Sequence, residues 1–467
     1  MNWEQLLCSR RERAHSTKNS EEIRTEFRRD YHRIVGSASF RRLQDKAQVY
    51  PLERGDFVRT RLTHSLEVSS FAESLGDMIF RRLKANNTPG ITDNVREDCC
   101  DILRCAGLLH DIGNPPFGHF GEFAIRRWFK DNLPSLSFNG KPVSDLLNEQ
   151  MKADLLNFEG NAQALRIVAR LHCLTDLSTG MNLTYALLNT IVKYPVSSLE
   201  IDKNSGDIRT KKMGYFLSER ELFNEVTSNT GANQCRHPLT FILEAADDIA
   251  YLTADIEDAV IKGYISFELL HKALSDQAHT DETIAIADKD LCDCKETVLE
   301  RSMPDPEKKA VQQWIVRLQN MMIYAAADSF CDNYDDIMDG TFRTDLLGAG
   351  RAKKLAELLG GIAYKKAFRS KSIVMSELRE HTIMNSLLKN IVDMALNFDL
   401  EDSSNFHRDL SEILSENYIE ICRNKCKSAQ SESERCYYRI MLATDCISGM
   451  TDSYAEKFYR MLNGLGD

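Results

Sequence analysis

Helical periodicity is the feature that most constrains the fold of this chain. Apolar residues recur at steps of three and four through most of the sequence, which places them along one side of an α-helix. Only ten prolines and twenty-three glycines occur among 467 residues, so few positions interrupt these stretches. The pattern predicts an all-α protein, with helices over 63–85, 94–110, 145–175 and 239–262 among others.

Strand-like alternation is scarce in the sequence. Residues 196–217 contain VSSLEIDKNSGDIRT, in which polar turn residues separate two short apolar stretches. We therefore expect at most a short β-hairpin near 196–217, with an exposed loop as the alternative.

Composition and charge narrow the functional class. Hydrophobic residues make up 43% and charged residues 28% of the chain, which is typical of a soluble globular protein. No apolar run approaches the roughly 18 to 20 residues that a membrane helix needs, and the first residues lack the apolar stretch of a signal peptide. We expect a cytoplasmic protein that does not bind membranes.

The net charge of −11 argues against a surface built for nonspecific nucleic-acid binding. Any anionic ligand must instead meet a local group of cations. Basic residues do concentrate at 24–33 and 40–43, although a solvated helical face explains most runs of this kind. The thirteen cysteines fit no paired zinc-ribbon spacing, so we expect reduced, mainly buried thiols.

One short segment, GLLHDIGNPPFGHFGE at 107–122, concentrates chemically active side chains. His110 and Asp111 offer a neutral nitrogen and an anionic oxygen, a ligand mix that suits Mn, Fe, Co or Zn better than Ca. His119 and Glu122 are three residues apart and share a face if that stretch is helical, as an acid/base pair requires. An isolated His-Asp pair is usually accidental, but the cluster predicts a metal-dependent hydrolytic site.

Two further stretches contribute possible ligands. His64 stands at the start of a predicted helix, where a side chain can face a site, although a lone histidine more often has no such role. Asp247, Tyr251 and Asp255 follow one another at four-residue steps within an apolar helix and therefore share a face. Unpaired carboxylates are costly to bury, so this face meets either water or a cationic or hydrogen-bonding partner.

Taken together, His64, His110, Asp111 and Asp247 resemble the metal-binding pattern of the HD phosphohydrolase superfamily, in which H, then HD, then D follow along the chain. More closely, the sequence resembles the bacterial deoxyguanosine triphosphate triphosphohydrolases. The resemblance runs nearly end to end and rests on long motifs: RTEFRRDYHRIVGSASFRRLQDKAQVYPLE at 24–53, RTRLTHSLEV at 59–68, HDIGNPPFGHFGE at 110–122, FEGNAQALRI at 158–167, KYP at 193–195, EAADDIAYLTADIEDA at 244–259 and ISGMTDSYA at 447–455.

The resemblance implies an HD-domain helical bundle with additional helices. It also implies a specific reaction. One divalent metal per site would lie next to the α-phosphate, held by the four matched ligands His64, His110, Asp111 and Asp247. The metal would be Mg, Mn or another first-row metal such as Fe, Co or Zn. The family's catalytic pair matches His119, which handles a proton, and Glu122, which orients the ring. Cleavage of dGTP at the α-phosphorus would release deoxyguanosine and tripolyphosphate.

The resemblance also implies which residues bind the substrate. Three groups would contact the polyphosphate, the sugar and the base edge, and Glu159 and Asn161 would line or brace the site. The matched positions are Arg61, Lys193, Tyr194 and one of Lys211 or Lys212 for the phosphates, Tyr251 and Asp255 for the sugar, and Gln48 and Val49 for guanine.

For domain organisation we predict an HD-type phosphohydrolase core at 1–270, a polar connecting segment at 271–305 and a helical C-terminal part at 306–467 packed on the core, unless all helices form one domain. The resemblance implies a homo-oligomer, for which a hexamer is one option, with Arg435 or Arg439 reaching a neighbour's site. Single-stranded nucleic acid is a conceivable regulator.

Two rival functions remain open at this point. A related deoxynucleotide triphosphohydrolase would share the HD core and accept other bases. A nucleotide- or nucleic-acid-sensing protein would carry an inactive HD core and use the basic runs at 24–33 and 40–43. The intact ligand set and the His119–Glu122 pair favour an enzyme.

Overall fold

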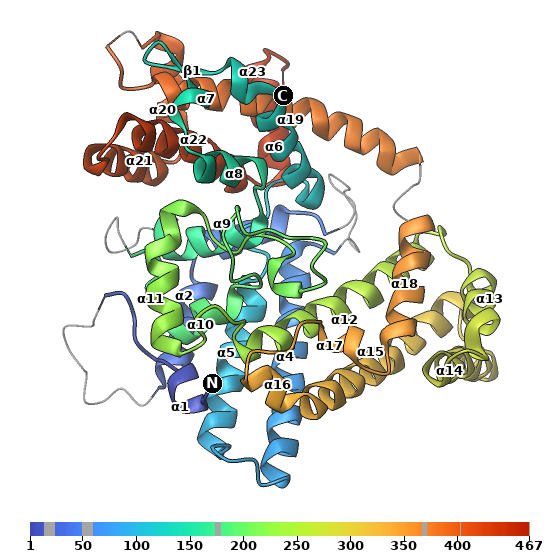
Figure 1. The fold of residues 1–467 in the computed structure, drawn as a ribbon. Helices are drawn as coiled ribbons and strands as arrows, with labels where there is room; N and C mark the ends of the chain where they lie inside the picture. The colour runs from blue at the N-terminus through green and yellow to red at the C-terminus, as the bar shows by residue number, and fades with distance from the viewer. Residues whose placement is uncertain (14–23, 49–58, 173–178, 367–370, 402, 467) are drawn as a thin grey trace. The chain divides into compact units, whose positions relative to one another are not determined.

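The computed structural model of the chain describes residues 1–13, 24–48, 59–172, 179–366, 371–401 and 403–466 (Figure 1). Regular structure in these residues is helical except for one two-stranded sheet, so the predicted all-α class is confirmed. No helix in the described residues is long and apolar enough to span a bilayer. No disulfide joins the described cysteines.

The chain divides into two compact units, each assembled from separate stretches of sequence. The first unit contains 1–66, 108–237 and 376–467, and the second contains 67–107 and 238–375. The helices α4 (Arg61–Ala85), α5 (Asp93–Leu109) and α19 (Lys371–Asn397) each pass from one unit to the other. The predicted division into a core at 1–270, a connecting segment at 271–305 and a C-terminal part at 306–467 stays a prediction. Residues 271–305 are largely helical.

The first unit carries most of the short elements. Its remaining helices are α1 (Trp3–Leu6), α2 (Glu26–Val35), α3 (Ala38–Arg41), α6 (Gly118–Asn132), α7 (Val143–Leu146), α8 (Glu149–Leu156), α9 (Gly160–Arg166), α10 (Tyr185–Ile191), α11 (Arg220–Thr230), α20 (Asn405–Ile413), α21 (Glu416–Ser428), α22 (Glu432–Ser448) and α23 (Asp452–Leu462). Single turns of tighter or wider helix are η1 (Arg42–Asp45), η2 (Leu133–Ser135), η3 (Ile167–Leu171), η4 (Ile208–Thr210) and η5 (Leu217–Glu219). In its core, α22 is buried almost continuously from Cys436 to Ser448.

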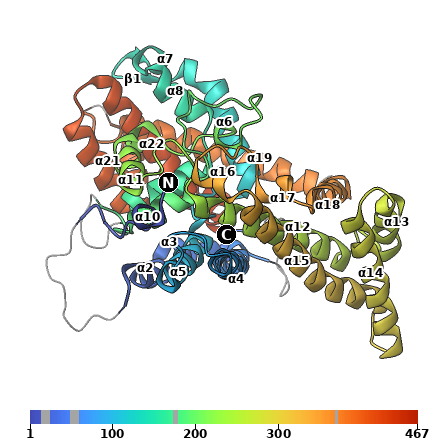
Figure 2. The same ribbon diagram turned by 60° about the horizontal axis from the view of Figure 1, so that its bottom comes forward.

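The second unit consists of helices packed against one another, most of them long. They are α12 (Pro238–Ile261), α13 (Phe267–Ala278), α14 (Glu282–Glu300), α15 (Pro306–Asp332), α16 (Tyr334–Met338), α17 (Leu346–Ala349) and α18 (Lys353–Lys366), together with most of α4 and α5. Figures 1 and 2 both show α13, α14 and α15 as neighbours. Trp314 of α15 is fully buried, and its indole Nε1 donates to the carbonyl oxygen of Ala287 in α14 at 2.8 Å.

One local prediction is wrong. The predicted helix over 145–175 is broken into α7, α8, α9 and η3, because Asn148 caps α8 through its side chain and Glu159 adopts an extended conformation. Residues 196–217, for which we expected at most a short hairpin or else a loop, contain η4 and no strand, so the loop is the alternative that the structure supports. The side chain of Asp207 there accepts a hydrogen bond from the backbone N–H of Arg209.

The one described sheet lies elsewhere, where β1 (Ser137–Phe138) pairs with β2 (Lys141–Pro142). Asn139 and Gly140 connect the strands with φ of 50° and 73°. Both values lie in the left-handed region that a two-residue Asn-Gly hairpin turn requires. This dipeptide is the sequence signal that would have located the hairpin.

Candidate active site

The His-Asp pair lies just beyond the end of a helix. The last residue of α5 is Leu109, and His110 and Asp111 follow in a turn. Because they are outside the helix, these neighbours can face the same side: Nε2 of His110 is 3.6 Å from Oδ2 of Asp111. A single ion can therefore contact both of these consecutive residues, which neighbours within a helix do not normally allow.

His64, in the first turn of α4, joins this pair. The imidazole rings of His64 and His110 are edge to face with their centroids 5.2 Å apart, and a nitrogen of each lies within 4.8 Å of the other. Both residues are buried. These two imidazoles, with the Asp111 carboxylate 3.6 Å from His110, offer donors that suit a first-row transition metal or a harder divalent ion.

Asp111 is oriented by two other side chains. Arg61 is also buried, and its Nη1 donates to Oδ2 of Asp111 at 2.5 Å. The amide of Asn114 donates to Oδ1 at 2.6 Å. Hydrogen bonds of this kind fix a ligating carboxylate before an ion arrives. Asn114 was not among the predicted site residues, although its place in the 110–122 motif was a signal.

The turn that follows carries the chain into α6. Phe117 has a φ of 64°, and its backbone N–H donates to Oδ1 of Asp452 at 2.9 Å. Gly118 has a φ of 58°, and a Cβ there would lie 2.3 Å from Nη2 of Arg61. The glycine therefore lets the turn lie against the Arg61 guanidinium. The residues between the HD pair and α6 therefore form a turn.

His119 and Glu122 lie on one face of α6, with Nδ1 of His119 3.4 Å from Oε2 of Glu122. The His119 side chain is 79% exposed, whereas the Glu122 side chain is 2% exposed. An exposed imidazole oriented by a buried carboxylate is the arrangement that proton transfer to or from a bound ligand requires.

Glu122 keeps its charge although it is buried. Burial alone would raise its pKa, but the hydrogen bond with His119 and the positive charge of Lys212 outweigh burial, and the pKa is lowered. The backbone N–H of Gly160 also donates to Oε1 of Glu122, at 2.8 Å. A Cβ on Gly160 would lie 2.2 Å from Oδ1 of Asn114, so this close approach requires glycine.

Glu159 and the lysine pair complete the polar cluster. Nζ of Lys212 donates to Oε1 of Glu159 at 2.8 Å, and the amide of Asn161 donates to the same oxygen at 3.1 Å. Burial and repulsion from Glu122 raise the pKa of Glu159. Lys211 is exposed, so Lys212 is the lysine of the pair that contacts this cluster.

The other predicted phosphate residues of the first unit, Lys193 and Tyr194, are buried in the segment that follows α10. The carbonyl oxygen of Lys193 accepts from Nε of Arg236 at 2.7 Å. The backbone N–H of Gln48 donates to the Arg59 carbonyl oxygen at 3.4 Å. Val49 lies outside the described residues.

The remaining three predicted residues belong to α12 of the second unit. Since α12 is an uninterrupted helix, Asp247, Tyr251 and Asp255 share one face, as their spacing predicted. Asp255 is 2% exposed, Asp247 is half-buried and Tyr251 is 36% exposed. Burial and the neighbouring Asp255 carboxylate raise the pKa of Tyr251.

Two buried groups that sequence reasoning missed support the turn before α6. Nζ of Lys46 donates to the carbonyl oxygens of Asn114 and Ser448, at 2.5 and 2.7 Å. Asp452, at the start of α23, accepts from the backbone of both Ala47 and Phe117. No local pattern in the sequence marks these long-range contacts.

The hypothesis that Arg439 reaches a neighbouring subunit is wrong. Arg439 is buried, and its Nη1 donates to the carbonyl oxygens of Ala395 and Phe398 of its own chain, at 3.0 and 2.7 Å. Its guanidinium also lies over the Phe398 ring, 4.7 Å from the centroid. The Arg439 side chain therefore makes its contacts inside the first unit.

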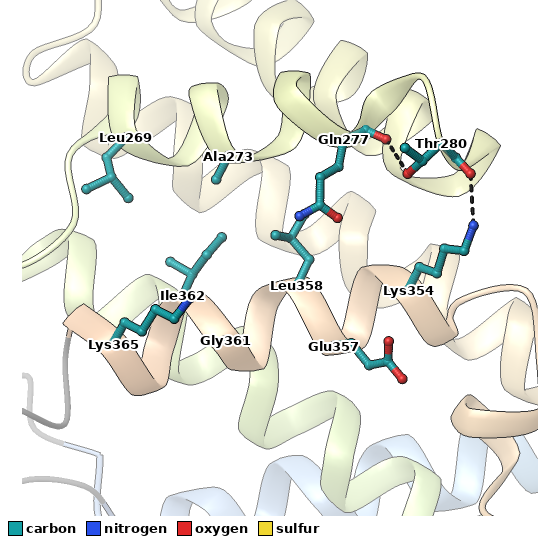
Figure 3. A pocket seen from close by; sticks show the side chains of 10 residues that line it. All are labelled: Leu269, Ala273, Gln277, Thr280, Lys354, Glu357, Leu358, Gly361, Ile362 and Lys365. Atoms are coloured by element: carbon teal, nitrogen blue, oxygen red, sulfur yellow. Dashed lines mark hydrogen bonds between the residues drawn. The ribbon is translucent and has the colours of Figure 1, made fainter.

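A cavity of about 720 Å³ lies in the second unit, between α13 and α18 (Figure 3). Leu269, Ala273 and Ile362 give it an apolar side, and Nζ of Lys354 donates to the Thr280 carbonyl oxygen at one end. None of the predicted site residues that the structure describes lines this cavity. It is therefore distinct from the histidine and carboxylate cluster.

Comparison with known proteins identifies the family. The HD domain family matches residues 61–186, which include His64, the HD pair and the His119–Glu122 pair. A Listeria monocytogenes protein named deoxyguanosinetriphosphate triphosphohydrolase-like protein is 43% identical over the full length of both chains. A Synechocystis protein of the same name is 33% identical over 100% of both chains, and the deoxyguanosinetriphosphate triphosphohydrolase of Klebsiella pneumoniae is 34% identical over 93% of each. The chain therefore belongs to the deoxyguanosinetriphosphate triphosphohydrolase family of HD-domain hydrolases, as its motifs predicted.

Proposed function

We propose that this protein hydrolyses dGTP at the α-phosphorus and releases deoxyguanosine and tripolyphosphate. The observation that carries the proposal is found in the first unit, where the buried imidazoles of His64 and His110 lie beside the half-buried Asp111 carboxylate, together with the His119–Glu122 pair. The names of the relatives supply the substrate. The donor set supplies a place for a metal, and the pair supplies proton transfer.

The proposed metal ligands are His64, His110 and Asp111, with Asp247 of α12 as the fourth, on the family pattern. The nitrogen and oxygen donors fit a divalent ion such as Mn or Mg, or another first-row metal. Such an ion, when bound, polarises the α-phosphate and offsets the charge that develops on it. Arg61 and Asn114 keep the Asp111 carboxylate oriented toward this role.

His119 is the proposed proton-transfer residue. Its exposed imidazole can exchange a proton with the attacking water or with the leaving 5′ oxygen, while the ionised Glu122 orients the ring and stabilises its protonated form. Glu122 in turn is fixed by the Gly160 backbone. His119 therefore touches the reacting atoms, and Glu122 acts through it.

The proposed substrate contacts follow the family motifs. Arg61, Lys193, Tyr194 and Lys212 would meet the polyphosphate, and we choose Lys212 over Lys211 because it contacts the Glu159 and Glu122 cluster. On α12, Asp255 would accept from the 3′ hydroxyl, and the Tyr251 ring would exclude a 2′ hydroxyl. Gln48 and Val49 would contact guanine. Homo-oligomerisation, regulation by single-stranded nucleic acid and a cytoplasmic location stay predictions.

Product analysis in H₂¹⁸O tests the reaction. The metal-loaded protein is incubated with each of the four deoxynucleoside triphosphates and with GTP. We expect turnover of dGTP alone, with ¹⁸O in the tripolyphosphate, because attack at the α-phosphorus breaks the bond to the 5′ oxygen. Equal turnover of all four deoxynucleotides would support a broad-specificity enzyme, pyrophosphate or orthophosphate would contradict the proposed cleavage, and no turnover would favour the sensor alternative.

A pair of variants on α12 tests the fourth ligand. Asp247→Ala should abolish turnover and lower the bound metal. Asp248→Ala removes a half-buried carboxylate one position along the same helix, off the face shared with Tyr251, and should keep both properties. Full activity in Asp247→Ala would remove this residue from the ligand set.

A further inference from the structure

The second unit contains a cluster of metal-ligating side chains that the proposed function does not use. His271 lies on α13, and Asp288 and Cys292 lie on α14. One donor atom of each lies within 4.8 Å of the others. Nδ1 of His271 is 2.8 Å from Oδ1 of Asp288 and 3.6 Å from Sγ of Cys292, so a single ring nitrogen faces both partners.

The fold fixes the positions of these three residues. Asp288 and Cys292 are four residues apart and therefore project from the same face of α14. The connection between the two helices is short, and Asp281 caps α14 by accepting from the backbone of Thr283 and Ile284. Apolar side chains of both helices, such as Leu270 and Leu291, are fully buried. The cluster therefore sits on a packed helical hairpin.

The cluster is also accessible to an ion. The His271 side chain is 41% exposed and that of Asp288 is 17% exposed, and Cys292 is half-buried. The carboxylates of Asp288 and Asp293 place negative charge near the Cys292 thiol, which favours an added cation. Solvent can supply a further ligand.

We propose that His271, Asp288 and Cys292 form a second metal site, which takes a zinc-class divalent ion with water in the fourth position. A tetrahedral zinc ion with bonds of about 2.0 to 2.3 Å separates its sulfur and nitrogen ligands by about 3.5 Å and its nitrogen and oxygen ligands by about 3.3 Å. The sulfur to nitrogen distance in the cluster already matches. The histidine and aspartate must separate by about 0.5 Å, as expected when an ion replaces the proton between them.

The thiolate decides the class of metal. Sulfur ligands favour zinc, cobalt and similar ions, whereas magnesium prefers oxygen ligands. Binding releases the thiol proton, and the neutral His271 ring carries its one proton on Nε2 while Nδ1 binds the ion. The bound ion would join α13 to α14 and stabilise the hairpin.

Cobalt titration of the full-length protein tests this site. Cobalt bound to a cysteine thiolate gives a charge-transfer absorption band in the near ultraviolet, and the proposed catalytic site, with nitrogen and oxygen ligands only, gives none. We expect one thiolate-bound cobalt per chain, displaced by zinc and unaffected by magnesium. Failure of the proposed dGTP hydrolysis would leave this result unchanged.

Matched variants assign the band. Cys292→Ser should abolish it, and His271→Ala should weaken binding by more than the roughly 10- to 100-fold typical of losing an outer partner. Cys331→Ser, a half-buried cysteine of α15, and His279→Ala, an exposed histidine that follows α13, should leave it intact. Absence of the band in the unmodified protein, or its survival in Cys292→Ser, would overturn the proposal. Circular dichroism confirms that each variant is folded.

Discussion

At the scale of single residues, Glu122 shows how a carboxylate stays ionised in a buried position. Its two oxygens meet different groups: the Gly160 backbone N–H approaches one, and His119 the other. The nearby charge of Lys212 adds to these contacts, so the pKa is lowered in spite of burial. Glu122 can therefore orient His119 across the neutral pH range.

His119→Ala should lower kcat for dGTP by roughly 10²- to 10⁴-fold, the usual contribution of a positioned acid or base. Metal content should not change, because His119 is not a proposed ligand. Arg127→Ala, on the same helix, removes only an exposed ion pair with Asp131 and serves as the control. Steady-state kinetics and metal analysis check both variants. A normal kcat in His119→Ala would exclude it as the proton-transfer residue.

Two glycines give opposite predictions for the same substitution. Gly160→Ala should destabilise the fold by about 1 to 3 kcal/mol and reduce turnover, because its Cβ would lie 2.2 Å from Oδ1 of Asn114 and 2.8 Å from Oε1 of Glu122. Gly361→Ala lies in α18 with nothing within 4 Å of the added carbon, so it should stabilise by about 0.5 to 1 kcal/mol. Denaturant unfolding measures both. Equal effects at the two positions would refute the packing argument.

At the scale of elements, α19 carries a buried acid whose charge depends on pH. Glu380 is 1% exposed and accepts from the hydroxyl of Ser376, one turn earlier, at 2.6 Å. Burial raises the pKa of Glu380 to about 7, and Asp452 of α23 adds to the shift. Because the folded-state pKa is above the usual value, the stability that Glu380 contributes is present at low pH and is lost as pH rises through about 7.

Glu380→Gln should therefore stabilise the protein at pH 8, by an amount on the order of 3 kcal/mol, and change little near pH 5. The amide keeps the shape of the side chain without its charge. Glu377→Gln, an exposed position on the same helix whose charge makes only a minor contribution to the raised pKa of Glu380, should show a much smaller pH dependence. Unfolding free energies at the two pH values provide the test, and a pH-independent effect of Glu380→Gln would contradict it.

At the scale of the whole molecule, buried ion pairs between residues distant in sequence hold the segments of the first unit together. Arg166 of α9 donates through Nε and Nη2 to the two oxygens of Asp445 in α22, both at 2.7 Å, and through Nη1 to Glu219 at 2.7 Å. Burial opposes the charge of Arg166, but the two carboxylates outweigh it and raise its pKa. The C-terminal helices are therefore part of the unit that carries the HD pair.

Arg166→Met should destabilise the protein by about 3 to 5 kcal/mol, since it leaves Asp445 and Glu219 buried without their cation. Arg127→Met, which removes only the exposed ion pair with Asp131, should change stability by less than about 1 kcal/mol. Thermal unfolding of both variants compares them directly. A small effect of Arg166→Met would show that water or another cation reaches the two carboxylates.

The sequence by itself determined the helical class, the family and the grouping of the HD pair with His119 and Glu122. Helical periodicity and contiguous motifs are local properties of the chain, so they can be recognised without knowledge of tertiary contacts. The breaks at Asn148 and Glu159 depended on side-chain capping and backbone conformation, and the periodicity did not show them.

Only the tertiary structure decided which distant groups support the site. The roles of Lys46, Gly160 and Asp452, and the contact of Lys212 with Glu159, follow from contacts between segments as much as about four hundred residues apart. No pattern along the chain encodes such contacts, because a buried polar group must find its partner wherever the packed helices bring one within hydrogen-bond distance.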